Sequence, residues 1–253
     1  MLIWVASYPR SGNTLTLLVL RNVFGIGNLV ALGGDELRAG MPAIKLPSGR
    51  EVKEAELPDV SLPKQLRWMR DSDETYFVKT HRVRDANSPD RALHCVRDGR
   101  DSLVSHAHYT GEGVSPRYDG MGFEDRLEYL MQRKRDGPPM GTWGSHTKRW
   151  TERSAPTARI RFEDLISNPI RVVRRACREI DYRLPRASGS LPDFELLREG
   201  DEVIFRRGQV GSYRDEMPPE IERRFWRAHG AQMRALGYAR DDSGAAAGRS
   251  VTG

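Results

Sequence analysis

Short apolar segments and longer amphipathic segments alternate along most of the chain. Runs too short for helices, either apolar throughout or alternating, predict strands at 2–7, 76–78, 91–96 and 159–162. The longer segments predict helices at 14–24, 62–71, 102–109, 123–134, 142–153, 163–180 and 218–236. The stretches 26–61, 110–122 and 183–200 have no steady period, and we expect loops or irregular structure there. Strands that alternate with helices indicate an α/β fold with a mostly parallel central sheet flanked by helices.

Boundary signals refine this pattern. Asp98 or Asp101 is suited to cap the helix at 102–109. Pro169 predicts a break or restart within 163–180. A chain of 253 residues can bury a sizeable core as one domain, which we assign to 1–238. The tail 239–253, rich in Ser, Gly and Ala, is expected to be disordered.

The first predicted strand runs into a tight turn, Tyr8-Pro9-Arg10-Ser11-Gly12-Asn13-Thr14, and a helix follows at once. A strand, a loop and a helix N-terminus together form an anion-binding site, because free backbone N–H groups and the positive helix end converge there. Arg10 adds a full positive charge. Gly12 and Thr14 fit the nucleotide-kinase pattern, but Asn13 occupies the position of its lysine. This P-loop-like loop indicates a phosphate-bearing ligand; an ordinary strand–turn–helix connection is the alternative.

Polar groups follow three other apolar runs. Lys79-Thr80-His81 ends the second predicted strand, Arg97 ends the third with Ser105 one short helix further on, and Arg206-Arg207-Gly208 follows the apolar residues 203–205. Ligands of open parallel sheets bind beyond the carboxyl ends of the strands. We therefore expect these cations to converge on one ligand that carries two clusters of phosphate charge.

Composition narrows the class of protein. The formal net charge of +6 suits an acidic or phosphate-rich ligand, but the chain has no dense basic tract, which argues against nucleic acid. Cys95 lies in an apolar strand-like run and Cys177 in a helix-like run, and both are expected in the core, with no disulfide framework or metal-ligand cluster. The start of the chain lacks the pattern of a signal peptide, and no apolar stretch is long enough to span a membrane. A cytoplasmic protein is the resulting expectation.

Six motifs, in order along the chain, resemble the sulfotransferases that use 3′-phosphoadenosine 5′-phosphosulfate (PAPS). They are Tyr8-Pro9-Arg10-Ser11-Gly12-Asn13-Thr14, Lys79-Thr80-His81, Arg97 to Asp101 with Ser105, Gly141-Thr142-Trp143 with His146 and Trp150, Arg161-Phe162-Glu163-Asp164-Leu165 with Asn168-Pro169, and Arg206-Arg207-Gly208. The resemblance covers about residues 3–214 and implies the α/β fold already expected from the pattern. It also implies PAPS as cosubstrate without a metal, and a small-molecule acceptor.

The resemblance implies a role for each matching residue. Arg10 and Lys79 would stabilise charge on the transferring and leaving groups, and His81 would be the general base on the acceptor. The implied nucleotide-binding set is Arg10, Ser11, Gly12, Asn13, Thr14, Leu15, Arg97, Ser105, Phe162, Ile204, Arg206, Arg207 and Gly208. The chain departs from the family pattern at five of these positions, where the family commonly has Lys at 10, Thr at 13, an aromatic residue at 15, Tyr at 162 and Phe at 204. These departures affect the expected packing of the adenine more than the phosphate sites.

Other functions remain open from the sequence. A phosphotransferase with a degenerate loop would need Mg²⁺ and a lysine after Gly12, and Asn13 argues against it. A non-catalytic nucleotide-binding protein would not need His81. The alternative for His81 is a strand-end histidine with a structural hydrogen bond. The motifs predict no oligomeric state. We expect the acceptor to be bound by the irregular segments 26–61, 110–122 and 135–142, with four aromatic residues as candidates: Tyr109, Tyr118, Phe123 and Trp143.

Overall fold

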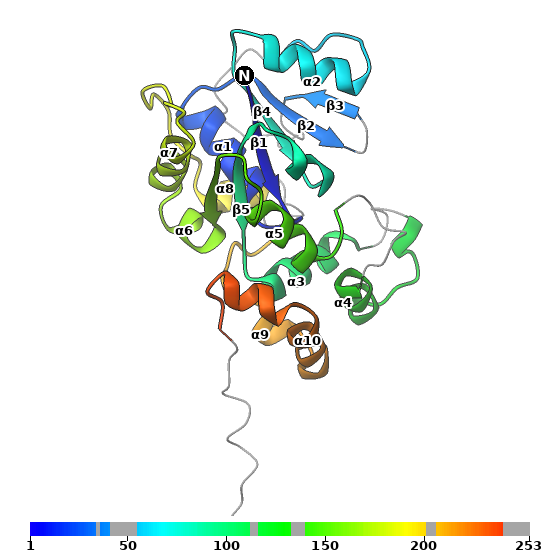
Figure 1. Cartoon of the computed structure of the whole chain (residues 1–253). Coiled ribbons are helices and arrows are strands. Elements are labelled where there is room, and N and C mark those ends of the chain that lie inside the picture. Colours follow the sequence, from blue (N-terminus) through cyan, green and yellow to red (C-terminus); the bar gives the residue numbers. More distant parts are fainter. Residues whose placement is uncertain (34–35, 41–54, 112–115, 133–139, 201–205, 240–253) are drawn as a thin grey trace, which may run out of the picture.

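A computed structural model describes residues 1–33, 36–40, 55–111, 116–132, 140–200 and 206–239. Ile204 and the expected tail beyond Ala239 lie outside the described residues. Within them, a six-stranded sheet has the order β3-β2-β4-β1-β5-β6 (Figure 1). The strands are β1 (Leu2–Ser7), β2 (Leu29–Gly33), β3 (Glu36–Ala39), β4 (Tyr76–Thr80), β5 (Arg91–Val96) and β6 (Thr157–Arg161). All neighbouring pairs are parallel except β2 and β3, so the predicted fold class is confirmed.

The central strand β1 shows why the sheet is covered on both faces. All six of its residues are buried, and their side chains alternate between two cores. Ile3 and Val5 pack in one core with residues of the helices on that face, whereas Leu2, Trp4 and Ala6 join a second core on the other face. A parallel strand that is buried on both sides reads as a continuous apolar run, which is the pattern seen at 2–7.

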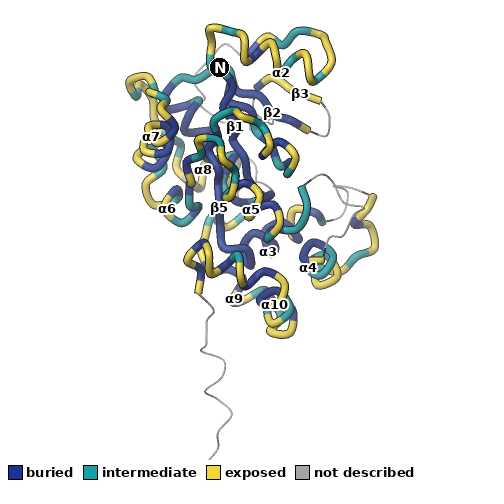
Figure 2. The backbone as a smooth tube through the Cα atoms, in the orientation of Figure 1, coloured by how far each residue is buried: buried dark blue, intermediate teal, exposed yellow. Residues whose placement is uncertain are grey.

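Helices form a layer on each face and a further group beyond the sheet. Their bounds are α1 (Asn13–Leu18), continued by a π-helical stretch η1 (Val19–Val23), α2 (Leu62–Asp71), α3 (Gly99–Tyr109), α4 (Phe123–Gln132), α5 (Trp143–Thr151), α6 (Phe162–Ser167), α7 (Pro169–Glu179), α8 (Phe194–Gly200), α9 (Tyr213–Glu216) and α10 (Pro219–Ala235). Short 3₁₀ turns occur at η2 (Arg84–Asn87) and η3 (Pro116–Tyr118). Helices α1 and α7 contribute to the first core, α2 and α5 to the second. Figure 1 shows α3, α9 and α10 beyond the carboxyl end of β5, and Figure 2 shows the dark, buried strands between helices whose outer sides are exposed.

Most expected elements occur, with two corrections. Strands β2 and β3 lie in the stretch 26–61, for which we expected loops, and α8 lies in 183–200, expected to be irregular. The apolar run of β2 is only a few residues long between glycines, and β3 (Glu36–Ala39) is an edge strand too short for its alternation of polar and apolar residues to form a pattern. Neither gives the repeated period on which a sequence-based prediction depends. The break at Pro169 is confirmed, because α6 ends at Ser167 and α7 begins at Pro169.

Candidate functional site

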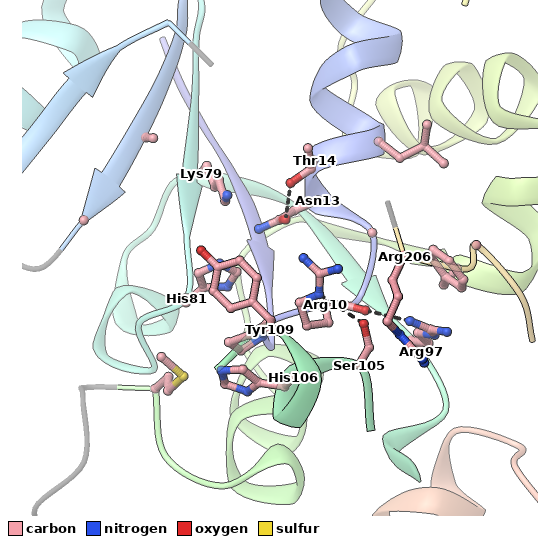
Figure 3. Close-up of a pocket in the computed structure, with 18 of the residues that line it drawn as sticks. Arg10, Asn13, Thr14, Lys79, His81, Arg97, Ser105, His106, Tyr109 and Arg206 are labelled. Carbon is pink, nitrogen blue, oxygen red and sulfur yellow. Dashed lines mark hydrogen bonds between the residues drawn. The ribbon is translucent and has the colours of Figure 1, made fainter. Parts of the chain in front are cut away.

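A cavity of about 730 Å³ opens where β1, β2, β4 and β5 end (Figure 3). Its lining includes most of the site residues expected from the sequence: Arg10, Gly12, Asn13, Thr14, Leu15, Lys79, His81, Arg97, Ser105, Phe162, Arg206, Arg207 and Gly208. Ser11 is buried behind the lining, where its Oγ lies 3.1 Å from Ser102 Oγ on α3. The convergence of separate strand ends on one cavity follows from the parallel sheet.

The loop between β1 and α1 has an unusual backbone. Arg10 and Gly12 both adopt positive φ angles, 68° and 105°. Left-handed residues in such a loop turn successive backbone N–H groups toward a common concave point, which favours an anion. Gly12 also has little free space: a Cβ there would lie 3.1 Å from Phe162 Cδ2 and 3.2 Å from Leu165 Cδ2, so these side chains would have to shift. The loop therefore packs tightly against α6 while it faces the cavity.

Two arginines connect this loop to the rest of the site. Arg10 Nε donates a hydrogen bond to Ser105 Oγ at 3.1 Å, and its guanidinium lies 5.1 Å from the ring centroid of Tyr109. The buried Arg97 donates to the backbone oxygens of Arg10 at 3.2 Å and Gln209 at 2.8 Å. Arg97 thus joins the first loop to the segment that carries Arg206 and Arg207. Burial lowers the pKa of Arg97, an effect that an anionic ligand would offset.

His81 has a defined tautomer. Its Nδ1 lies 2.7 Å from the backbone oxygen of Ser7, and because a carbonyl oxygen only accepts, Nδ1 carries the proton. The neutral ring then has its lone pair on Nε2. Removal from water, with the positive charge of Lys79 and Arg10, lowers the pKa of His81 to about 3, so the ring is neutral at ordinary pH. A neutral ring with a fixed acceptor nitrogen can take a proton from a bound hydroxyl.

Lys79 lies near the same end of the cavity (Figure 3). Burial and the nearby charge of Arg10 lower the pKa of Lys79 to about 8. Two cations held together in this way favour a ligand with concentrated negative charge, because the anion relieves their mutual repulsion.

Arg206 and Arg207 lie at another part of the cavity wall, and both form ion pairs with Glu216. Arg206 is close enough to Arg97 to lower the pKa of its guanidinium. The site therefore has two groups of cations, Arg10 with Lys79 and Arg97 with Arg206 and Arg207.

The match to known proteins agrees with this arrangement. Residues 2–237 match the family model described as the sulfotransferase domain. The chain belongs to the sulfotransferase domain family. Mouse (Mus musculus) sulfotransferase 1E1 is 20% identical over 259 aligned positions, which cover 91% of this chain and 82% of the relative. Mouse sulfotransferase 1B1 is 22% identical over 213 positions, which cover 79% of this chain and 67% of the relative.

Solved structures support the fold of this sulfotransferase. Mouse sulfotransferase SULT7A1, complexed with PAP, superposes with a TM-score of 0.58 at 16% identity and covers 96% of this chain and 86% of its own. A retinol dehydratase in complex with retinol and PAP superposes with a TM-score of 0.57 at 18% identity and covers 95% of this chain and 83% of its own.

Several residues of the sulfotransferase have structural contacts instead of a place in the cavity wall. Asp98 caps α3 by accepting from Arg100 N at 2.9 Å, and Arg100 pairs with Asp98 and Glu222, both at 2.8 Å. Cys95 and Cys177 are buried in the core, as expected, and Trp143 and Trp150 are buried as well. Of the four aromatic residues considered for the acceptor, Tyr109 lines the cavity, whereas Tyr118, Phe123 and Trp143 do not line it.

The rest of the cavity wall comes from two expected segments and two positions that were not expected. The stretch 26–61 contributes Ala31, Leu32, Gly33, Arg38, Ala39 and Gly40, and 135–142 contributes Met140. We expected both segments to border the acceptor, but as loops, and did not predict strands β2 and β3. Ile166 of α6 and Ser212 were not predicted as part of the wall. His106 also lines the cavity.

The described ranges contain no group of three or more His, Cys, Asp or Glu side chains that could hold a metal ion. No helix in the part of the chain that the structure describes has the length and apolar character needed to cross a membrane.

Proposed function

We propose that this sulfotransferase transfers the sulfuryl group of PAPS to a hydroxyl or amine of a small-molecule acceptor. The observation that carries the proposal is the position of His81, with its proton fixed on Nδ1, in one cavity with two separate groups of cations. PAPS has two separate anionic groups, the 5′-phosphosulfate and the 3′-phosphate. Arg10, Lys79 and the backbone of the first loop would bind the former, and Arg97, Ser105, Arg206 and Arg207 the latter.

The chemistry follows from these roles. Nε2 of His81 accepts the proton of the acceptor group as the acceptor atom forms its bond to sulfur. The bond from sulfur to the bridging oxygen breaks, and its electron pair leaves with the 5′-phosphate. By analogy with phosphoryl transfer, positioning and fixed positive charge near the leaving oxygen supply most of the rate. Arg10 and Lys79 are the charges suited to that oxygen.

The rest of the cavity wall is suited to bind the apolar part of an acceptor molecule. Ala31, Leu32, Tyr109 and Met140 line the cavity together with His81. An apolar wall with few polar groups binds small organic molecules and presents one reactive group to the base. Two of the solved structures similar to this chain are complexes with retinol or androsterone, which is consistent with such an acceptor here.

Calorimetric titration of PAP in the presence of EDTA tests the nucleotide part of the proposal, with AMP and ATP as comparisons. We expect tight PAP binding without metal and much weaker binding of AMP, which lacks the 3′-phosphate. ATP binding that requires Mg²⁺, with no preference for PAP, would contradict the proposal and favour a phosphotransferase. An acceptor screen with PAPS then tests the transfer itself.

A further inference from the structure

One carboxylate outside the cavity wall holds two of the cations that form it. Glu216, at the end of α9, accepts from Arg206 Nη1 at 3.0 Å and Nη2 at 2.9 Å, and its Oε1 lies 3.1 Å from Arg207 Nη1. His108 Nε2 on α3 lies 2.6 Å from its Oε2. Only 14% of the Glu216 side chain is exposed. Its carboxylate is therefore shared by two guanidinium groups and fixed by a third partner.

The position of Glu216 is set by α3 and not by the two arginines alone. The buried Asp101 accepts from the backbone N–H groups of Gly211 at 2.7 Å and Tyr213 at 3.0 Å, and from Ser212 Oγ at 3.2 Å. These bonds hold the start of α9 on α3. Glu216 follows within the same short helix, so its carboxylate is in place before any ligand binds.

Arg206 and Arg207 need such a partner. They are adjacent cations, and Arg97 adds a third positive charge nearby. Without a counter-charge, long arginine side chains repel one another and sample many rotamers in water, and a ligand must then bear the cost of ordering them. Partial burial alone would raise the pKa of Glu216. Hydrogen bonds from Arg206 and His108 outweigh this effect and hold the pKa below its ordinary value, so the carboxylate stays ionised.

We propose that Glu216 is a positioning residue for the nucleotide. It holds Arg206 and Arg207 in the orientation that receives the 3′-phosphate, and thereby sets the preference for a nucleotide with that phosphate over one without it. The inference rests on the proposed function, because it assigns the 3′-phosphate to this pair of arginines.

The test measures dissociation constants of PAP and AMP by calorimetry for the wild type, E216Q and E216D. Glutamine keeps the size of the side chain but removes the charge, and aspartate keeps the charge but withdraws the carboxylate by one methylene. We expect both variants to weaken PAP binding about tenfold, or about 1.4 kcal/mol, and to change AMP binding less than about twofold. E216D is decisive on its own, because it keeps the charge and changes only the position of the carboxylate. If E216D fails to fold, E216Q is interpreted through its effect in an R206A/R207A background.

Two control variants separate positioning from general effects. D215N removes an exposed negative charge one residue away, and E222Q removes the partner of Arg100, which does not line the cavity. Both should retain the wild-type ratio of PAP to AMP affinity. In an R206A/R207A background, E216Q should have no further effect on PAP binding, since nothing remains to be positioned.

The outcomes distinguish the inference from the proposed function. Equal weakening of PAP and AMP, or PAP binding that is unchanged or tighter in E216Q and E216D, would overturn the role of Glu216 alone. A wild type that binds PAP no better than AMP would overturn the proposed function and the inference with it. Weakening by E216Q with a wild-type E216D would mean that only the charge matters, and would also overturn positioning.

Discussion

At His81 a single hydrogen bond determines which ring nitrogen is able to act. The acceptor of that bond is the backbone oxygen of Ser7, the last residue of β1 and the residue just before the first loop. His81, the proposed base, and the first loop, proposed to bind the phosphosulfate, are therefore both connected to the end of β1. Ser7 Oγ is farther from Nδ1, at 3.4 Å, so the orientation depends on the backbone and not on the serine side chain.

Replacement of His81 by glutamine should remove the proton acceptor and leave the nucleotide site in place. We expect kcat with PAPS and an identified acceptor to fall about 10³-fold, whereas PAP affinity changes less than about twofold. Steady-state kinetics and calorimetry measure the two quantities. S7A is the matched control, since it retains the backbone carbonyl and should keep most of the activity. Full turnover by H81Q would refute the assignment of the base.

Ionisation of Lys79 should make kcat/KM for PAPS depend on pH in the alkaline range. With the pKa of its ammonium lowered to about 8 by burial and Arg10, Lys79 loses its charge as the pH rises through that value in the free enzyme. We expect kcat/KM for PAPS to fall above about pH 8, because kcat/KM reports free-enzyme ionisations. The anionic nucleotide stabilises the ammonium, so the fall in kcat should occur at higher pH. His81 adds no acid limb near neutrality, since its pKa is about 3.

A K79R variant tests whether Lys79 causes the fall in kcat/KM above about pH 8. The guanidinium remains charged throughout the range, so any activity that K79R retains should no longer fall near pH 8. An unchanged alkaline limb in K79R would assign the ionisation to another group.

Among the elements, α3 was predicted well and β2 poorly, for identifiable reasons. The polar cluster Asp98 to Asp101 after an apolar run marks a helix start with a cap, and Asp98 is the cap. The run at 29–32 sits between glycines in a stretch with no repeated period, and its pairing with β4 depends on residues far along the chain. Local signals therefore predicted the loops that carry the proposed phosphate-binding motifs, but not the strands β2 and β3 at one side of the sheet.

The same limit applies to the partners of the site residues. The sequence pointed to Arg206 as a ligand and left Asp101 as structural, but the contact between Arg206 and Glu216 depends on how α9 packs on α3. No spacing in the sequence encodes that packing. The sequence could therefore predict which arginines belong to the site, but not which carboxylates pair with them.

The attachment of α9 to α3 through Asp101 should matter for both stability and ligand binding. D101N replaces a fully buried carboxylate that accepts three hydrogen bonds, and we expect a loss of about 3 kcal/mol in the free energy of unfolding. PAP affinity should fall at least about tenfold, because the segment with Arg206 and Arg207 is released. D125N, an exposed carboxylate that accepts from Gly122 N, is the control and should alter neither. Urea denaturation and calorimetry check this, and wild-type values for D101N would contradict it.

Across the whole molecule, the site depends on layers that have no direct contact with a ligand. The two cores on the faces of the sheet fix the strand ends, and a third core beyond the sheet joins α3, α4 and α10. This third core and the sheet interior also bury histidines that have no part in the proposed reaction. His94, His146 and His229 are 1%, 0% and 6% exposed. They link the stability of the whole fold to pH.

Burial lowers the pKa of His94 to about 3 and of His229 to about 4, and it holds the pKa of His146 well below its ordinary value. In the unfolded chain each ring titrates near 6.5. Below that pH the unfolded state binds more protons than the folded state, so the free energy of unfolding is highest above about pH 6.5 and falls as the pH decreases.

Each buried ring should lower the free energy of unfolding by about 2 kcal/mol at pH 5. Urea denaturation between pH 7.5 and 5 should therefore show a steep loss, and H229Q, which removes one such group far from His81 in the sequence, should reduce the slope by about one proton. A free energy of unfolding that stays constant over this range would show that the rings are accessible to protons in the folded state.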